Sequence, residues 1–327
     1  MLARRTNIHF GTHAVAQTPL LLPSFSSKGF PQVAEIMDFM SEFITTGILI
    51  SAYDVHYRLI SQNRITFPGL ILLDSGGYEA RIEHDLSETY MRPYTPESWP
   101  YRYYRRVLRD WRVKVPTIVV SYDTPYRFLS LKEQFTKASE IKGDYPHLLL
   151  DFLIKPEEKG AHVPMEKVIQ HVEHLRGYDI VGFTDVELDD SVFGRMTKIA
   201  RLRRAMDSVG VKAPIHIFGS LDALNTALYF IAGAEVFDGL TWLRFGYHDG
   251  CTLSAQNYGV LREADGIRRN LDDQYYDMWK NNYYYLEDLR TQMVNYVAKN
   301  DISQFQHNGR TLRNAYRQLE ASADPAR

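Results

Sequence analysis

The stretch LILLDSGGY at residues 70–78 joins a run of apolar residues to an abrupt polar end that begins at Asp74. A continuous apolar run of this length is typical of a strand buried on both faces, as in a parallel sheet. Seven further stretches have the same form. They are PLLLPSF (19–25), ILISAYD (48–54), PTIVVSYD (116–123), HLLLDFLIK (147–155), IVGFTD (180–185), PIHIFGS (214–220) and VFDGLTW (236–242).

Longer segments with helical periodicity lie between most of these runs. Examples are residues 32–43, 100–111, 131–141, 165–175, 190–208 and 221–231. Alternation of buried strands with helices is typical of βαβ units. Eight strands favour a closed barrel over an open sheet, so the sequence predicts an α/β protein with a (β/α)₈ barrel of the TIM type. The link between the runs at 48–54 and 70–78 is short and need not contain a full helix.

We expect the barrel to form one catalytic domain over residues 1–264, with a short hairpin before the first strand. Beyond it the character of the sequence changes, and residues 265–300 and 303–320 read as helices. Residues 265–327 are therefore predicted to be a C-terminal helical extension packed on the barrel. The chain has 327 residues, and a (β/α)₈ barrel is one of the few architectures in which a chain of this length folds as a single unit.

The composition excludes several classes of protein. Hydrophobic residues make up 45% of the chain and charged residues 24%, which is enough apolar material to exclude wholesale disorder. No apolar run approaches the roughly 20 residues that span a bilayer, and the start MLARR leads into polar sequence. We therefore expect no signal peptide, no membrane partner and a cytoplasmic location. Cys251 is the only cysteine, which excludes an internal disulfide and a multi-cysteine zinc site.

Charged side chains end most of the strand candidates, and this grouping is the main functional signal. In barrel enzymes the chemistry lies at the carboxyl ends of the strands. Carboxylates held together there cannot all ionise freely, and environments that separate their pKa values create an acid and a base. Any single aspartate could instead cap a helix or close a turn. The charged residues are Asp54, Asp74, Asp123, Lys155, Asp185 and Asp238.

Two of these strand ends suggest specific chemistry. After Asp74, the pair Gly76 and Gly77 lets the backbone approach a ligand closely, and Tyr78 offers a face for stacking. A tight strand-to-helix turn without a ligand would explain the glycines equally well. In the last strand, Asp238 could act as a nucleophile at an acetal-like carbon. It could also be a buried aspartate that holds the end of the barrel.

The DSGGY stretch and the sequence FDG at 237–239 together resemble the tRNA-guanine transglycosylases, including relatives that place 7-deazaguanines in DNA. The family has an irregular (β/α)₈ barrel and exchanges a guanine base in a polynucleotide for a 7-deazaguanine. The likeness runs through most of the chain. Further similar segments lie at 18–23, 51–53, 121–126, 181–187, 218–220, 233–238 and 282–305.

The resemblance implies a pentosyltransferase with defined roles. Asp238 would attack C1′ of the target nucleotide and expel guanine, which forms a covalent glycosyl intermediate. Asp74 would be the general acid and base for the leaving and incoming bases. Asp123 would bind the guanine-like edge, Gly182 would lend backbone contacts and Tyr78 would stack. The other substrate-binding residues implied are Ser75, Gly76, Gly77 and Tyr53.

The chain departs from the family at the zinc site. The family's Cys-x-Cys-x-x-Cys run is missing, so we expect neither a metal nor another cofactor. The segment LRFGYH at 243–248 has a single arginine where the family has an arginine-rich loop that meets tRNA. The expected partners are thus a 7-deazaguanine base and a polynucleotide, which is either DNA or tRNA. The missing zinc site favours the hypothesis of DNA. An oligomer is possible.

Two alternatives stay open at this point. Water could replace the incoming base, which would make the protein a glycosidase of a small 7-deazaguanine nucleoside. The chain could also be a non-catalytic partner subunit of an active transglycosylase, although the presence of both Asp74 and Asp238 argues against this.

Overall fold

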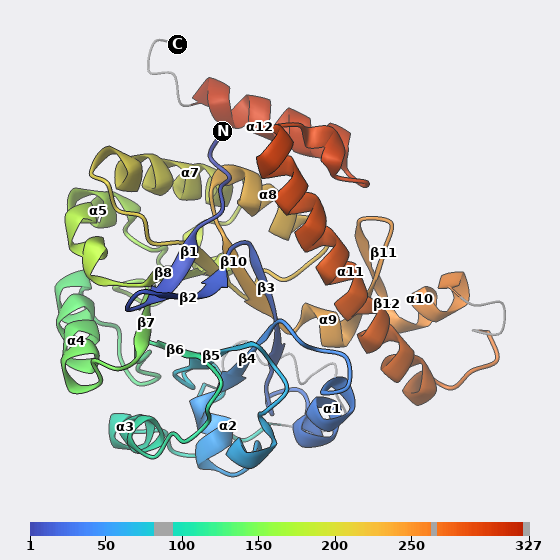
Figure 1. Ribbon diagram of the computed structural model, residues 1–327, viewed down its shortest axis with the longest axis horizontal. Helices are drawn as coiled ribbons and strands as arrows, with labels where there is room; N and C mark the ends of the chain where they lie inside the picture. The colour runs from blue at the N-terminus through green and yellow to red at the C-terminus, as the bar shows by residue number, and fades with distance from the viewer. Residues whose placement is uncertain (82–93, 263–266, 323–327) are drawn as a thin grey trace. The chain divides into compact units, whose positions relative to one another are not determined.

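The apolar runs form the eight parallel strands of a closed barrel (Figure 1), which confirms the predicted (β/α)₈ architecture. The computed structural model describes residues 1–81, 94–262 and 267–322. The strand order is β10-β3-β4-β5-β6-β7-β8-β9, so the last strand closes on the first. The strands are β3 (Leu20–Phe25), β4 (Gly47–Ser51), β5 (Leu70–Asp74), β6 (Thr117–Val120), β7 (Leu149–Ile154), β8 (Ile180–Thr184), β9 (Ile215–Phe218) and β10 (Val236–Gly239).

Burial explains why these strands read as continuous apolar runs. Every residue of β4 and of β7 is buried, because a barrel strand has the interior on one face and helices on the other. The helices of the barrel region are α1 (Val33–Met40), α2 (Ala52–His56), α3 (Tyr101–Arg109), α4 (Leu131–Asp144), α5 (Met165–Gln170), α6 (Asp185–Leu188), α7 (Val192–Ser208), α8 (Asn225–Ala232) and α9 (Thr241–Arg244). The short link after β4 holds only the five-residue α2 and one 3₁₀ turn, Gln62–Arg64.

The chain divides into two compact units. One consists of Met1–Pro23, Pro164–Gly177 and Gly182–Arg327, and the other of Ser24–Val163 and Tyr178–Val181. The domain boundary predicted between residues 264 and 265 lies outside the described residues.

The unit that contains both termini carries the predicted hairpin and the C-terminal helices. Strands β1 (Asn7–Phe10) and β2 (His13–Gln17) pair antiparallel, as do β11 (Phe245–His248) and β12 (Cys251–Ser254). Helix α10 (Ala255–Arg262) packs against α11 (Leu271–Lys299), and α12 (Gly309–Ser322) packs against α7 and α8. Helix α11 buries Leu286, Leu289 and Met293 at helical spacing, so its apolar stripe forms core.

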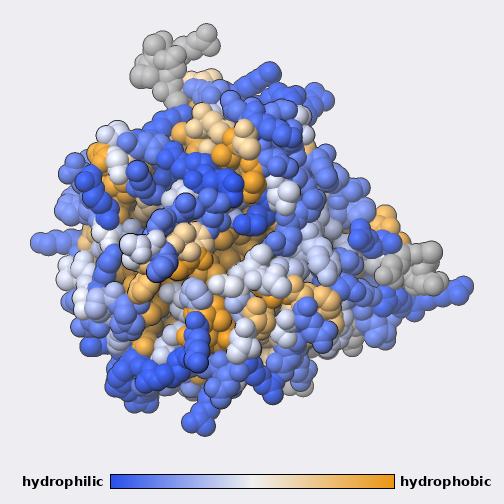
Figure 2. All heavy atoms as spheres, viewed as in Figure 1, coloured by the Kyte–Doolittle hydropathy of each residue, from blue (hydrophilic) through white to orange (hydrophobic). Residues whose placement is uncertain are grey.

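The described part of the chain holds no helix that is both long and apolar enough to cross a membrane. Helix α11 has 29 residues, but charged side chains recur along it. Figure 2 shows a face on which hydrophilic residues predominate and hydrophobic residues are exposed in smaller areas.

A buried ion pair ties α7 to the segment before β10. Arg203 and Glu235 are both 0% exposed, and Arg203 Nη2 donates to Glu235 Oε1 over 3.0 Å. Thr18 Oγ1 donates to the other carboxylate oxygen over 2.7 Å. Burial lowers the pKa of Arg203 to about 10 and raises that of Glu235, so desolvation opposes both charges. Each charge offsets part of the cost of burying the other.

Replacing Glu235 by Gln should lower the free energy of unfolding by about 3–5 kcal/mol, because it leaves the Arg203 charge buried without its counter-ion. Urea denaturation measures the loss. The control is Asp110→Asn, which removes an ion pair with Arg109 on the surface and should change stability little. Equal unfolding midpoints for Glu235→Gln and the control would contradict the assignment.

Candidate functional site

The loop that follows β5 is shaped by contacts with protein side chains. Asp74 is the last residue of β5, and its Oδ2 accepts from the Gly76 N–H over 2.9 Å. Gly76 has φ +87°, and a Cβ there would lie 2.8 Å from both Trp99 Nε1 and Tyr53 Cβ. Trp99 Nε1 also donates to Ser75 O over 2.8 Å. Glycine is therefore required by a tight turn packed on an indole.

The second glycine lies against the aspartate that was predicted to bind the base. A Cβ at Gly77 would lie 2.8 Å from Asp123 Oδ2. The Asp123 N–H donates to Ser75 Oγ over 3.1 Å, which fixes the loop after β6 to the loop after β5. The structure thus brings Ser75, Gly77 and Asp123 together.

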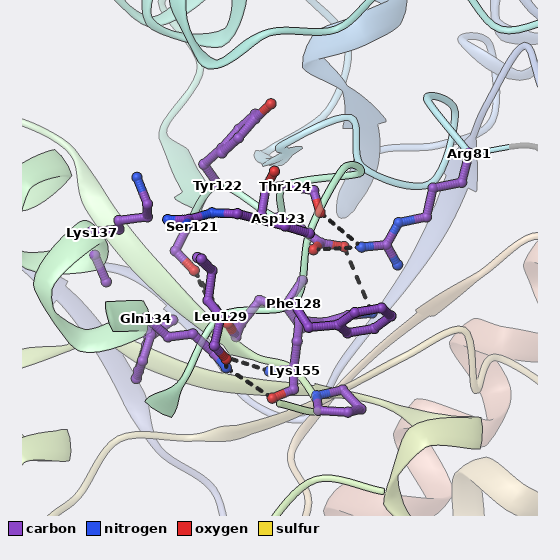
Figure 3. Close-up of a pocket in the computed structure, with 15 residues that line it drawn as sticks. Arg81, Ser121, Tyr122, Asp123, Thr124, Phe128, Leu129, Gln134, Lys137 and Lys155 are labelled. Carbon is purple, nitrogen blue, oxygen red and sulfur yellow. Dashed lines mark hydrogen bonds and ion pairs between the residues drawn. The ribbon is translucent and has the colours of Figure 1, made fainter. Parts of the chain in front are cut away.

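The Asp123 carboxylate already has two cationic partners. Arg81 Nη2 donates to Asp123 Oδ1 over 2.9 Å and to Thr124 O over 3.1 Å. Lys155 Nζ lies 3.7 Å from Asp123 Oδ2. Figure 3 shows the carboxylate turned toward the Arg81 guanidinium. Arg81 was not predicted as a site residue, because no local pattern in the sequence indicates that its side chain contacts Asp123, 42 positions later in the chain.

The two tyrosines assigned to substrate make contacts with protein groups. Tyr53 is 3% exposed, and its hydroxyl accepts from the Glu97 N–H over 2.6 Å. Burial raises the pKa of this phenol. Lys28 Nζ lies 4.4 Å from the centroid of the Tyr78 ring and donates to the Tyr78 carbonyl. A role for either ring in binding a ligand stays a prediction.

Two fully buried carboxyl groups lie next to the DSGGY loop. The Ser27 N–H and hydroxyl donate to Asp54 over 2.8 and 2.5 Å. The hydroxyls of Ser26 and Ser51 donate to Glu79 over 2.5 and 2.7 Å. Serine hydroxyls satisfy the carboxyl oxygens without supplying a positive charge.

Burial raises the pKa of Asp54 and of Glu79 to about 7 in each case. Repulsion from a neighbouring carboxylate also raises both pKa values, because Asp54 repels the charged form of Glu79 and Asp74 repels that of Asp54. Sequence reasoning placed Asp54 at a strand end but outside the site, and it missed Glu79. The signal for Glu79 was its position directly after DSGGY.

Asp238 lies in β10 and is 6% exposed. His216 Nε2 is 3.1 Å from Asp238 Oδ1, a hydrogen bond in which the imidazole donates because a carboxylate only accepts. The Gly219 N–H donates to the same oxygen over 3.2 Å. The predicted nucleophile is therefore held by two donors.

His216 was missed, because the sequence of one strand does not show which residues of the next strand lie beside it. In the pairing of β9 with β10, Val236 lies opposite His216 and Phe237 opposite Ile217. Continuing this register places Asp238 opposite Phe218. Because strand side chains alternate between the two faces, Phe218 and His216 share a face. Only the register between two strands reveals that the imidazole and the carboxylate share a face.

The end of β8 carries a further buried carboxylate. Asp185 Oδ1 accepts from the Tyr229 hydroxyl over 2.8 Å and from Arg195 Nη1 over 3.0 Å. Burial raises its pKa. Gly182 is buried inside β8 itself rather than in a loop, and its backbone contacts to a ligand stay a prediction.

The predicted site residues are distributed over both units. Gly182 and Asp238 belong to the unit with the termini. The unit that begins at Ser24 contains the others, namely Tyr53, Asp74, Ser75, Gly76, Gly77, Tyr78 and Asp123. Within the described residues, no group of three or more His, Cys, Asp and Glu side chains is arranged to hold a metal ion. The expectation of a metal-free and cofactor-free protein stays a prediction.

No protein-family model matches the chain, and no curated protein matches it.

Substitution of Gly76 by Ala should lower the free energy of unfolding by about 1–3 kcal/mol, because the residue has positive φ and no room for a Cβ. Urea denaturation compares this variant with Gly143→Ala. Gly143 lies in α4 with no heavy atom within 4 Å of an added Cβ, so alanine should be tolerated or stabilising there. A neutral Gly76→Ala would show that the turn is not constrained as described.

The carboxyl pair predicts a pH dependence of stability. Asp54 and Glu79 hold protons up to about pH 7 when folded, whereas their ordinary pKa values are 3.8 and 4.5. The folded chain therefore binds more protons between about pH 4 and 7, and these groups make the free energy of unfolding fall as pH rises through that window.

Asp54→Asn removes one of these titrations. Relative to the unmodified protein, this variant should gain stability as pH is raised from 5 to 8, as measured by urea denaturation at both values. Asp110→Asn, on the surface, serves as the control. A stability difference between Asp54→Asn and the unmodified protein that does not change with pH would refute the assigned pKa shift.

Proposed function

We propose that the chain is a pentosyltransferase that exchanges guanine in a polynucleotide for a 7-deazaguanine. The observation that carries the proposal is Asp238, a buried carboxylate in a barrel strand that is held by His216 and by the Gly219 N–H. Two donors fix one oxygen, which orients the carboxylate for attack at a sugar carbon. Barrel enzymes place such groups at the carboxyl ends of their strands.

The reaction would proceed in two displacements. Asp238 attacks C1′ of the target nucleotide, the bond from C1′ to the base breaks, and Asp74 gives a proton to the departing guanine. The incoming 7-deazaguanine then loses a proton to Asp74 and attacks C1′, which releases the Asp238 carboxylate. The proposal requires both side chains to reach one glycosidic bond. The target base must also leave its stack to enter the barrel.

Asp74 is supported as the acid and base by its surroundings. It ends β5 directly opposite Ser51 of β4, and its charge acts on the buried Asp54. Asp74 is thus a carboxylate at the carboxyl end of a barrel strand, which is where barrel enzymes place their catalytic groups.

Asp238→Asn should abolish a denaturation-resistant adduct with the nucleic acid and slow exchange by roughly 10³-fold or more. Asp74→Asn should slow exchange by roughly 10²–10⁴-fold, because it removes a general acid and base. The assay follows incorporation of labelled 7-aminomethyl-7-deazaguanine into guanine-containing DNA and, separately, into tRNA.

Asp110→Asn is the control and should exchange bases normally. Exchange by Asp238→Asn at the unmodified rate would remove this residue as nucleophile. Release of free guanine without incorporation would instead identify water as the acceptor, and the protein would then be a glycosidase.

A further inference from the structure

A pocket lies beside β6, β7 and α4 in the unit that begins at Ser24 (Figure 3). It holds about 460 Å³ of empty space, which includes the part open to solvent. Its lining comes from Arg81 in the segment after β5, from the loop after β6, from the first turns of α4 and from the end of β7. All of these elements belong to one compact unit.

The lining is strongly cationic. Among the residues that the structure describes, the lining holds four cationic side chains and one carboxylate, that of Asp123. Two of the cations, Arg81 and Lys155, hold this carboxylate between them. The four cations are Arg81, Arg127, Lys137 and Lys155.

The remaining two cations have weak partners. Arg127 Nη2 lies 3.5 Å from Glu133 Oε1, and both side chains are exposed, so this pair contributes little. Lys137 Nζ lies 5.4 Å from the centroid of the Tyr101 ring. The pocket therefore carries an excess of positive charge that a single carboxylate does not neutralise.

An aromatic side chain accompanies the charges. Phe128 lines the pocket and is 46% exposed, although a phenylalanine ring gains free energy when it is covered. In Figure 3 its ring lies on the same side of the pocket as Lys155 and Asp123. A flat apolar surface beside clustered cations suits a ligand that combines a planar base with an anion.

We infer that this pocket binds a phosphate group of a nucleotide, with Arg81, Arg127, Lys137 and Lys155 as the cationic contacts. Guanidinium and ammonium groups form strong charge-assisted hydrogen bonds to phosphate oxygens. The Asp123 carboxylate already pairs with two of these cations, so a bound phosphate would share them with the carboxylate or displace it. The inference goes beyond the proposed base exchange, because it assigns a phosphate contact to the pocket of Asp123, the residue to which the resemblance gave the guanine edge.

The phosphate could belong to a free nucleotide or to a polynucleotide backbone, since both present the same oxygens. Calorimetric titration with deoxyguanosine 5′-monophosphate, deoxyguanosine and a short single-stranded oligodeoxynucleotide separates these sources. The monophosphate should bind at least about 10-fold more tightly than the nucleoside. Tighter binding of the oligonucleotide than of the monophosphate assigns the site to the backbone, and the reverse assigns it to a free nucleotide.

Lys155→Gln should weaken binding of the monophosphate about 10-fold, because a hydrogen bond to a charged group is lost, and should leave the affinity for deoxyguanosine unchanged. For the oligonucleotide, it should also reduce the slope of log affinity against log salt by about 0.7. Arg127→Gln, on the rim, is a second variant with the same expectation. Lys132→Gln is the matched control, since Lys132 is exposed on α4 and does not line the pocket.

Equal binding of nucleoside and monophosphate, or equal effects of Lys155→Gln, Arg127→Gln and Lys132→Gln, would overturn the inference. These titrations contain no incoming base and need no turnover. Their failure would therefore leave the exchange reaction standing. Phosphate binding by a protein that does not exchange bases would refute only the proposed function.

Discussion

Closure of the barrel governs where polar groups can lie in this protein. Each strand has the interior on one face and helices on the other, so β4 and β7 are buried at every position. Strand β10 pairs with both β9 and β3, which leaves the sheet without a free edge. Charged side chains are consequently confined to strand ends and adjoining loops, unless other groups satisfy them inside.

The buried carboxyl groups are satisfied inside the protein in two ways, by a counter-ion or by hydrogen-bond donors. Glu235 gains a counter-ion in Arg203, whose charge offsets part of the cost of burying the carboxylate. Asp54 and Glu79 gain only donors from serine, and their pKa values rise to about 7. Both arrangements follow from the large cost of leaving a charge in a dry environment without a partner. The second leaves two groups that change protonation near neutral pH.

The site residues divide into those that a local pattern could identify and those that it could not. Asp74 and Asp238 follow from apolar runs that end in a carboxylate, and Gly76 follows from a turn that needs positive φ. Their partners were not foreseen. The Arg81 contact to Asp123 joins residues 42 positions apart, and the His216 contact to Asp238 joins residues 22 positions apart. No pattern within one segment contains such a pair.

The order of the barrel strands and of most barrel helices was determined by the sequence itself, because burial on both faces demands unbroken apolar runs and most of these helices show their own period. The same local logic placed the aspartates at strand ends. The hairpin of β11 and β12 and helix α10 were not predicted. Tertiary structure alone decided what each carboxyl group meets: two cations for Asp123, an imidazole for Asp238, two serine hydroxyl groups for Glu79. Those contacts depend on the register between strands and on loops that pack together, and both are set by the whole barrel rather than by any segment of it.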